Sequence, residues 1–349
     1  MNRTRFGLVV LVAAGVALLS ACDGEVRTIT VSTFADGSDA VAGDGVCEVT
    51  AGAGDCSLRA AIDEANTATQ TIEIVVPSGS YALTQAGADD LNAGGDLDLA
   101  ATLPVRFTVL GDGAEIDATG LDGGLDVRSG SVLVTKVAVN GATGSGVTVR
   151  NGAALTMSFS SLHHNGGAGL VVAAGGSANL SQSTVSTNTG FALQVDGQLN
   201  ATYLTIAANT AGKSTGAGTK SITQSISVSQ LTGADFMTGG TLEPLSNDLV
   251  PFHLPAPGSA IDSVELDSGF CGPVLYGLDQ RGAARAVGPG CDRGAIEVTS
   301  GRAFVVDSPL DVLDAVPGDG ICDVGNGTCT LRAAVTETNT FAGHDTVTL

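Results

Sequence analysis

The stretch from residue 125 to residue 211 consists of four similar segments, which open with Leu125-Asp126-Val127, Val147-Thr148-Val149, Leu170-Val171-Val172 and Leu193-Gln194-Val195. Successive openings are 22, 23 and 23 residues apart. Apolar positions that alternate and return with a period near 22 are what the rungs of a parallel β-helix require. Each rung would lie ~4.8 Å above the last, so that residues at equal positions stack on one another.

A second strand in each segment has a pattern of its own. An apolar column at Val132, Met157, Leu180 and Leu199 precedes by five residues a second column at Val137, Leu162, Val185 and Leu204. Hydroxyl residues lie between them (Thr135, Ser160, Ser183 and Thr202), and a corner follows at Asn140, Asn165 and Asn188, with Asn209 displaced by two places. A β-sandwich can also repeat its strands, but it has no reason to match the phases of Asn and hydroxyl residues. The sequence therefore predicts an all-β parallel β-helix, a solenoid with rungs over residues 70–235.

Composition agrees with this fold and excludes some partners. The chain has 49 Gly in 349 residues, no Trp and 4% aromatic residues, so it offers few bulky anchors for one globular core. Its 43% of hydrophobic residues is too high for a disordered chain. The formal net charge of −21 argues against nucleic acid and anionic lipid as partners.

A cap for the open first rung is expected over residues 27–68. Ser57 is a favourable N-cap, and Leu58, Ala61, Ile62 and Ala65 form one apolar stripe of a short helix. The pattern returns near the other end of the sequence, where Leu331, Ala334 and Val335 repeat the stripe. Residues 303–349 are therefore expected to be the start of a second, truncated module, whose apolar stripe would be exposed because no rung lies beneath it.

Residues 1–22 have the features of a lipoprotein signal peptide. Arg3 and Arg5 precede an apolar run over residues 7–19 that is short for a membrane span. The run ends in Leu19-Ser20-Ala21-Cys22, which resembles a lipobox, with Cys22 as the lipidated residue. The alternative is an ordinary secretory signal that happens to contain a cysteine. Either signal predicts an exported protein.

The seven cysteines fit an oxidising compartment. Assigning Cys22 to the lipid leaves six, which fall into the local couples Cys47/Cys56, Cys271/Cys291 and Cys322/Cys329. Zinc is the rival interpretation, but single pairs at these spacings without a nearby His disfavour it. Three disulfides are therefore expected.

Two further motifs carry a resemblance to a known family. Cys56-Ser57-Leu58-Arg59-Ala60-Ala61-Ile62 resembles the CSLREA N-terminal domain of bacterial surface β-helix proteins, with Ala60 in place of the usual Glu. The Asp279-Gln280-Arg281-Gly282 and Cys291-Asp292-Arg293-Gly294 segments resemble the choice-of-anchor Q domain, which places a disulfide-closed C-terminal cap over residues 240–298. The resemblance implies a right-handed parallel β-helix displayed outside the cell and implies no known reaction.

Residues that could carry out catalysis or bind a metal are few. Hydrolases need two opposed carboxylates, and β-helix lyases use carboxylates with Ca²⁺ and a basic residue. Across residues 125–211 the acidic residues are Asp126 and Asp196, and the pair of Asp126 and Lys136 is the one imaginable site. Acidic residues cluster instead in a Gly-rich segment, where the weak Ca²⁺ candidates are Asp89, Asp90, Asp96 and Asp98.

The sequence thus predicts a non-catalytic, cell-envelope-anchored β-helix that acts as a structural, adhesive or binding module. The alternative is a β-helix carbohydrate-active enzyme, either a polysaccharide lyase or a glycoside hydrolase. No cofactor other than Ca²⁺ is expected. The expected partners are the membrane, through the lipid anchor, and a glycan or surface protein, and the expected state is a monomer.

Overall fold

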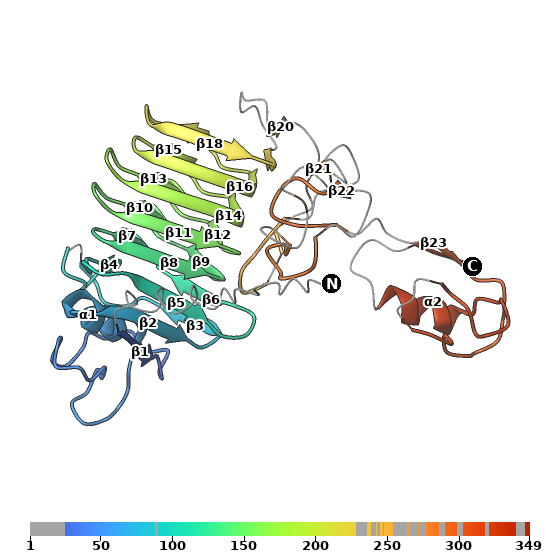
Figure 1. Ribbon diagram of the computed structural model, residues 1–349, viewed down its shortest axis with the longest axis horizontal. Coiled ribbons are helices and arrows are strands. Elements are labelled where there is room, and N and C mark those ends of the chain that lie inside the picture. Colours follow the sequence, from blue (N-terminus) through green and yellow to red (C-terminus); the bar gives the residue numbers. More distant parts are fainter. Residues whose placement is uncertain are drawn as a thin grey trace, which may run out of the picture.

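The computed structural model describes residues 25–87, 90–227 and 236–238. It also describes residues 242, 245–246, 248–253, 264–265, 271, 277–285, 290–298, 303–317, 321–339 and 346–349. Its main body is a parallel β-solenoid, which confirms the expected fold class (Figure 1). Within these ranges, the model contains no helix of the length and hydropathy that would cross a membrane.

The strands form three stacked columns. The first column contains β1 (Val26–Thr30), β2 (Thr71–Val76), β5 (Val105–Val109), β8 (Ser131–Thr135), β11 (Ala154–Ser158) and β18 (Thr219–Thr223). The second contains β3 (Gly79–Ala82), β6 (Ala114–Asp117), β9 (Val137–Asn140), β12 (Ser161–His163), β19 (Ser225–Ser227) and β20 (Phe236–Thr238). Two longer strands, β14 (Ser177–Ser186) and β16 (Gln198–Ala207), run through both columns and join them in one sheet.

The third column is a separate sheet, and its register is the one that the rung openings predict. It contains β4 (Leu97–Leu99), β7 (Leu125–Val127), β10 (Val147–Val149), β13 (Leu170–Val172), β15 (Phe191–Val195) and β17 (Gly212–Thr215). Val147 pairs with both Leu125 and Leu170, and Leu170 pairs with Leu193. Leu97 extends the same column by one rung, because it pairs with Leu125.

In the first and second columns, the predicted pairing of apolar residues is wrong by two residues at some of the rungs. Met157 pairs with Val134 instead of Val132, and Leu162 pairs with Val139 instead of Val137. At the other end of the four segments, Val185 pairs with Ile206 instead of Leu204. The inward face is nevertheless correct, because a shift of two residues leaves the side-chain parity of a strand unchanged.

The corner between the first two columns contains residues with positive φ and buried hydroxyls. Lys136, Phe159, Gln182, Tyr203 and Gln224 have φ between 42° and 58°. The hydroxyl of Ser160 accepts from the Val137 amide, 3.2 Å away, and the hydroxyl of Ser183 accepts from the Ser160 amide at 3.1 Å. Thr135 and Thr202 lie outside this series, since they pair with Ser158 and Ser181 in the neighbouring strands.

An asparagine ladder closes the corner after the second column. The side-chain amide of Asn165 donates to Asn188 over 2.9 Å, and that of Asn188 donates to Asn209 over 2.8 Å. Asn209 therefore belongs to the ladder in spite of its displacement in the sequence. Asn140 does not belong to it, because its amide donates to Glu115 and the ladder's next place is occupied by Ala142.

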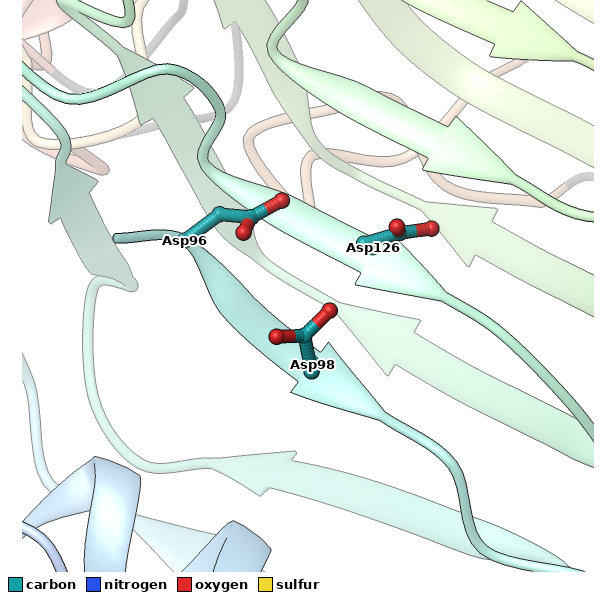
Figure 2. Close-up of side chains that lie close together, drawn as sticks. All are labelled: Asp96, Asp98 and Asp126. Atoms are coloured by element: carbon teal, nitrogen blue, oxygen red, sulfur yellow. The ribbon is translucent and has the colours of Figure 1, made fainter. Parts of the chain in front are cut away.

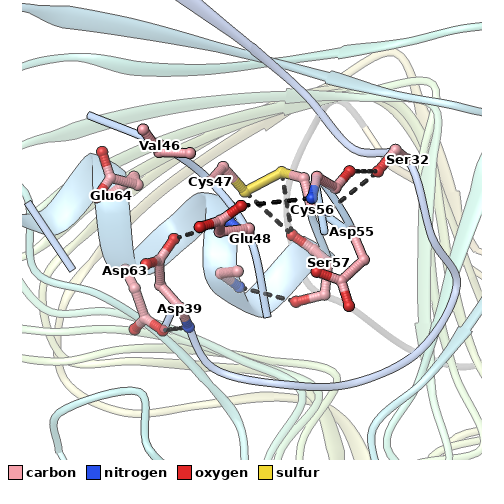
Figure 3. Close-up of a disulfide and its surroundings, with 12 residues drawn as sticks. Ser32, Asp39, Val46, Cys47, Glu48, Asp55, Cys56, Ser57, Asp63 and Glu64 are labelled. Carbon is pink, nitrogen blue, oxygen red and sulfur yellow. Dashed lines mark hydrogen bonds between the residues drawn. A yellow bond between two sulfur atoms is a disulfide. The ribbon is translucent and has the colours of Figure 1, made fainter. Parts of the chain in front are cut away.

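One helix covers the first rung of the solenoid. Helix α1 (Leu58–Thr67) begins after Ser57, whose hydroxyl accepts from the Ala60 amide, and its apolar face contacts β4 and β2. The Cys47–Cys56 disulfide lies immediately before the helix (Figure 3). Buried side chains of this cap and of the solenoid form one hydrophobic core.

The segment after the last rungs lies along the side of the solenoid over several turns. The Gln280 side chain accepts from the Thr184 hydroxyl at 2.6 Å, and the Ala295 amide donates to the Thr205 hydroxyl at 2.8 Å. The short strands β21 (Val264–Glu265) and β22 (Gly290–Cys291) pair here, and Cys271 is joined to Cys291. Figure 1 shows β21 and β22 beside the end of the rungs that carries the second column. We name the described residues between 248 and 298 the side strap.

A second small module follows. Strands β23 (Ala303–Val305) and β24 (Thr346–Thr348) are parallel, helix α2 (Leu331–Thr338) begins after Thr330, and Cys322 is joined to Cys329. All three cysteine pairs thus match the expected disulfides. Leu331 and Val335 are exposed as expected, whereas Ala334 is buried in a cluster with Phe304 and Cys329 inside the module itself.

Candidate functional site

Three aspartates meet where the third column begins. Asp98 and Asp126 are the middle residues of β4 and β7 and pair in register, and Asp96 immediately precedes β4. Leu97 and Leu99 enter the core, so the Asp98 side chain points to the opposite face of the sheet. Figure 2 shows the three carboxylates turned toward one another, and one oxygen of each lies within 4.8 Å of the others. We name these three residues the acidic cluster.

Two arginines neutralise part of the acidic cluster. Both oxygens of Asp126 accept from Arg150 Nε, at 3.0 and 2.9 Å, and Arg150 Nη2 lies 2.7 Å from Asp126. Arg128 Nη1 lies 2.8 Å from Asp126, 3.4 Å from Asp98 and 2.7 Å from Asp90. The Asp98 and Asp126 side chains are only 1% and 2% exposed, which leaves little room for another group to reach them.

Asp96 has a different electrostatic environment. Burial raises the pKa of Asp96 to about 7, and repulsion from Asp98, Asp122 and Asp126 adds to the effect. Its position depends on two features of the backbone. A Cβ atom at Gly123 would lie 2.7 Å from its Oδ2 atom, so the neighbouring turn must approach without a side chain. Arg59 of α1 donates to the Asp96 carbonyl at 3.0 Å, which ties the cluster to the N-terminal cap.

The structure thus joins two of the four Ca²⁺ candidates, Asp96 and Asp98. Asp90 lies beside Arg128 with its side chain 72% exposed, and Asp89 lies outside the described residues. Sequence reasoning missed Asp126 as their neighbour. The signal was present, because Leu97-Asp98-Leu99 has the same pattern as the rung opening Leu125-Asp126-Val127.

Carboxylate oxygens are the ligand type that Ca²⁺ prefers. However, Arg150 and Arg128 already approach Asp126 within hydrogen-bonding distance, so a cation would have to displace guanidinium groups. The carboxylate donors suit Ca²⁺, but the two arginines already supply positive charge to the cluster. Binding of Ca²⁺ therefore stays a prediction.

Asp126 and Lys136, the pair considered for catalysis, take part in different clusters. Lys136 Nζ donates to the Gly111 carbonyl at 3.2 Å, far along the rung from the carboxylates that surround Asp126. Its side chain lines a cleft of about 450 Å³ between the solenoid and the side strap. The lining consists of Ser78, Asp112, Lys136, Phe159, Asp248, Leu249, Val250, Phe252, Gln280 and Arg281. We name it the strap cleft.

The strap cleft contains aromatic rings that could stack on a sugar. Phe159 and Phe252 line it, and the Arg281 guanidinium lies 5.6 Å from the centre of the Phe252 ring. Tyr203 is fully buried, with Arg285 stacked 3.9 Å above its ring, so it is inaccessible to a ligand. Arg285 also donates to the carbonyls of Gly294 and Ala295, and this buried network holds the side strap together.

Replacing Asp96 with Asn should stabilise the protein at neutral pH. The unfolded chain releases this proton near pH 3.8, whereas the folded chain retains it up to about pH 7, so the wild type loses stability as the pH rises through that window. The gain of D96N over the wild type should be absent at about pH 3.5 and largest above pH 7, with a ceiling of about 4 kcal/mol. Urea denaturation across this pH range measures it. If Ca²⁺ binds the cluster, adding it should stabilise the wild type and leave D96N unchanged.

Comparisons with known proteins bear on the fold. Residues 115–237 match the family model described as "Right handed beta helix region". No curated protein matches the chain significantly. A solved structure titled "Crystal structure of pectate lyase Pel9A" aligns with 78% of this chain and 96% of its own, at 13% identity and a TM-score of 0.31. The family match and the three columns of parallel strands together show that the chain contains a right-handed β-helix region.

Proposed function

We propose that this protein is an exported, cell-envelope-anchored β-helix that binds a partner and does not transform it. The observation that carries the proposal is the state of Asp126, whose two oxygens are both occupied by guanidinium donors. A general base or nucleophile must have a lone pair within reach of its substrate. Asp126 and Asp98 are buried and hydrogen-bonded, so they act as structural anions that hold neighbouring rungs in register.

One observation favours the alternative, a carbohydrate-active enzyme. Asp96 has a pKa of about 7 and lies close to two other carboxylates, and such perturbed groups are frequent at active sites. A retaining glycosidase, however, needs a second carboxylate that reaches the sugar, and an inverting one needs room for water between the pair. Arg128 and Arg150 cover Asp98 and Asp126, so Asp96 is the one carboxyl group of the acidic cluster that is partly exposed.

The strap cleft is the surface that we propose for the partner. Two phenylalanine rings provide flat apolar area, while Asp112 and Asp248 add acceptors for hydroxyl groups. Arg281 is balanced by Asp279, 2.6 Å away, so the two lining carboxylates exceed the one remaining cation, Lys136. This balance suits a neutral saccharide better than an acidic one.

The envelope location depends on Cys22, which lies outside the described residues. Three disulfides support an oxidising compartment. Mass spectrometry of the N-terminal peptide tests the anchor, and an unmodified peptide that begins elsewhere would remove it from the proposal.

The binding proposal predicts a specific loss at Phe159. Purified protein without its signal should bind one or more neutral oligosaccharides on a glycan array, and F159A should weaken that binding by about tenfold or more, as for other central aromatic contacts. F191A is the matched control, because Phe191 lies on β15 in the other sheet. Equal binding by F159A and the wild type would contradict the role of the strap cleft.

The same protein should release no products from neutral and acidic polysaccharides, with or without Ca²⁺. Product formation is measured by reducing ends and by absorbance of unsaturated sugars. Cleavage that D96N abolishes would overturn the non-catalytic assignment and establish the acidic cluster as an active site.

A further inference from the structure

The chain contains two copies of one capping module, and their local structures agree in detail. The Ser57 hydroxyl donates to the Gly37 carbonyl in the first, and the Thr330 hydroxyl donates to the Val312 carbonyl in the second, at 2.5 and 2.6 Å. Arg59 pairs with Asp36 in the first copy, and Arg332 pairs with Asp311 in the second. Each copy has a parallel strand pair and a disulfide directly before its helix. The second module is therefore a folded cap.

The first copy shows what this cap binds. Arg59 donates to the backbone carbonyls of Asn92, Gly95 and Asp96 at 3.3, 2.9 and 3.0 Å. Its partner Asp36 accepts from the backbone amides of Thr84 and Gln85 at 2.6 and 2.8 Å. We name Arg59 with Asp36, and likewise Arg332 with Asp311, the clamp pair. The clamp pair binds the main chain of a Gly-rich loop, so its recognition depends on backbone shape more than on side-chain identity.

The same helix face also buries apolar side chains and forms hydrogen bonds with the backbone of a strand. Leu58 and Ile62 are 3% and 0% exposed beneath the first rung. The Asn66 side chain donates to the Asp98 carbonyl and accepts from the Ala100 amide, both at 2.8 Å, on either side of Leu99 in β4. On the edge away from β1, β2 pairs with β5 of the next rung. The complete contact surface is thus a clamp pair, an apolar patch, an asparagine and a strand edge.

In the second copy the corresponding surface is exposed. Leu331 and Val335, in the places of Leu58 and Ile62, are 48% and 44% exposed. The Arg332 and Asp311 side chains are 53% and 72% exposed while they keep the ion-pair geometry of the clamp. Asn339 is exposed in the place of Asn66. Within the described residues, β24 pairs only with β23, as β2 pairs with β1 in the first copy. Its other edge, which corresponds to the edge of β2 that pairs with β5, has no described strand beside it.

We propose that this exposed face of α2 and β24 is a docking site for the first rung of a β-solenoid that has no cap of its own. The first copy defines the partner's chemistry, which is a parallel strand edge next to a short Gly-rich loop with free carbonyl and amide groups. A second copy of this chain is a poor occupant. Its own first rung is already covered by its own disulfide-closed cap, which binds intramolecularly and therefore at high effective concentration.

The experiment extends the full chain at Leu349 with a second copy of residues 77–298. Leu349, directly after β24, corresponds to Val76, the last residue of β2. The added rungs would therefore continue from the second cap as the natural rungs continue from the first. Hydrogen exchange read by mass spectrometry should show α2 amides protected by about tenfold or more relative to the unextended chain. The variants R332A and V335D in the extended chain should lose this protection while α1 keeps its own.

A second arm does not depend on folding of the added rungs. A synthetic peptide of residues 82–99, which contains the loop and β4, is added to the unextended protein, and the exchange of α2 is followed with and without R332A. Slower exchange that requires Arg332 in either arm supports the docking site. Unchanged α2 exchange in both arms contradicts it. Dimerisation of the unextended chain that V335D abolishes would also overturn it, since a second copy would then be the occupant.

Discussion

Replacing Arg59 with alanine should lower the free energy of unfolding by about 3–5 kcal/mol, the usual effect of removing one partner from a buried ion pair. The Arg59 and Asp36 side chains are 0% and 2% exposed, so the substitution leaves a carboxylate buried without its partner. It also removes the donors to three loop carbonyls. Urea denaturation followed by far-UV circular dichroism gives the stability of the solenoid.

The matched variant is Arg332→Ala in the second module. Arg332 makes the same ion pair on the surface, where solvent screens it, so no measurable change in stability is expected. A further internal control uses pH. Burial alone would raise the pKa of Asp36, but hydrogen bonds from Arg59 and from the Gln85 and Thr84 amides outweigh it and hold the pKa below its usual value. The wild-type pair therefore contributes stability above the ordinary pKa of 3.8 that is lost as the pH falls below it, and the difference between R59A and the wild type should shrink there. Equal effects of R59A and R332A would contradict the importance of burial for the clamp pair.

The third column could be read from the sequence because its strands are short and regularly spaced. Each opening has two inward apolar residues around one outward residue, and the 22- to 23-residue interval admits one alignment of the four segments. Extending that alignment backward to Leu97 would have placed Asp98 beside Asp126. The acidic cluster was thus within reach of sequence reasoning, whereas its arginine partners depend on side-chain directions that the pattern does not contain.

The longer strands show the limit of the same reasoning. Alternation fixes which side chains enter the core, but any even shift preserves it, so the apolar pattern could not decide whether Leu162 faces Val137 or Val139. Turns of unequal length between the columns made the choice. The family resemblance predicts a C-terminal cap over residues 240–298. The path of the side strap along several rungs is not part of that prediction, because it depends on tertiary contacts such as that of Gln280 with Thr184.

Replacing Asn188 with alanine should destabilise the solenoid by about 2–4 kcal/mol, because several buried groups lose their hydrogen-bond partners at once. The Asn188 side chain is fully buried in the centre of the asparagine ladder. Its oxygen accepts from the Asn165 amide group and backbone amide at 2.9 and 3.0 Å. Its own amide group donates to the Leu162 carbonyl and to Asn209 at 3.1 and 2.8 Å. Alanine cannot replace any of these bonds.

The control for this prediction is Asn140→Ala, one rung before the ladder begins. Asn140 is half-buried and its side-chain amide donates to Glu115 at 2.6 Å, so its removal should cost only about 0.5–1.5 kcal/mol. Hydrogen exchange locates the damage, since nearest-neighbour coupling in a solenoid confines it mainly to adjacent rungs. N188A should therefore speed exchange in β12, β14 and β16 while β2 and β5 near the cap remain protected. If N140A were as destabilising as N188A, the ladder would contribute no more than an ordinary hydrogen bond, and the corner would be held by its backbone alone.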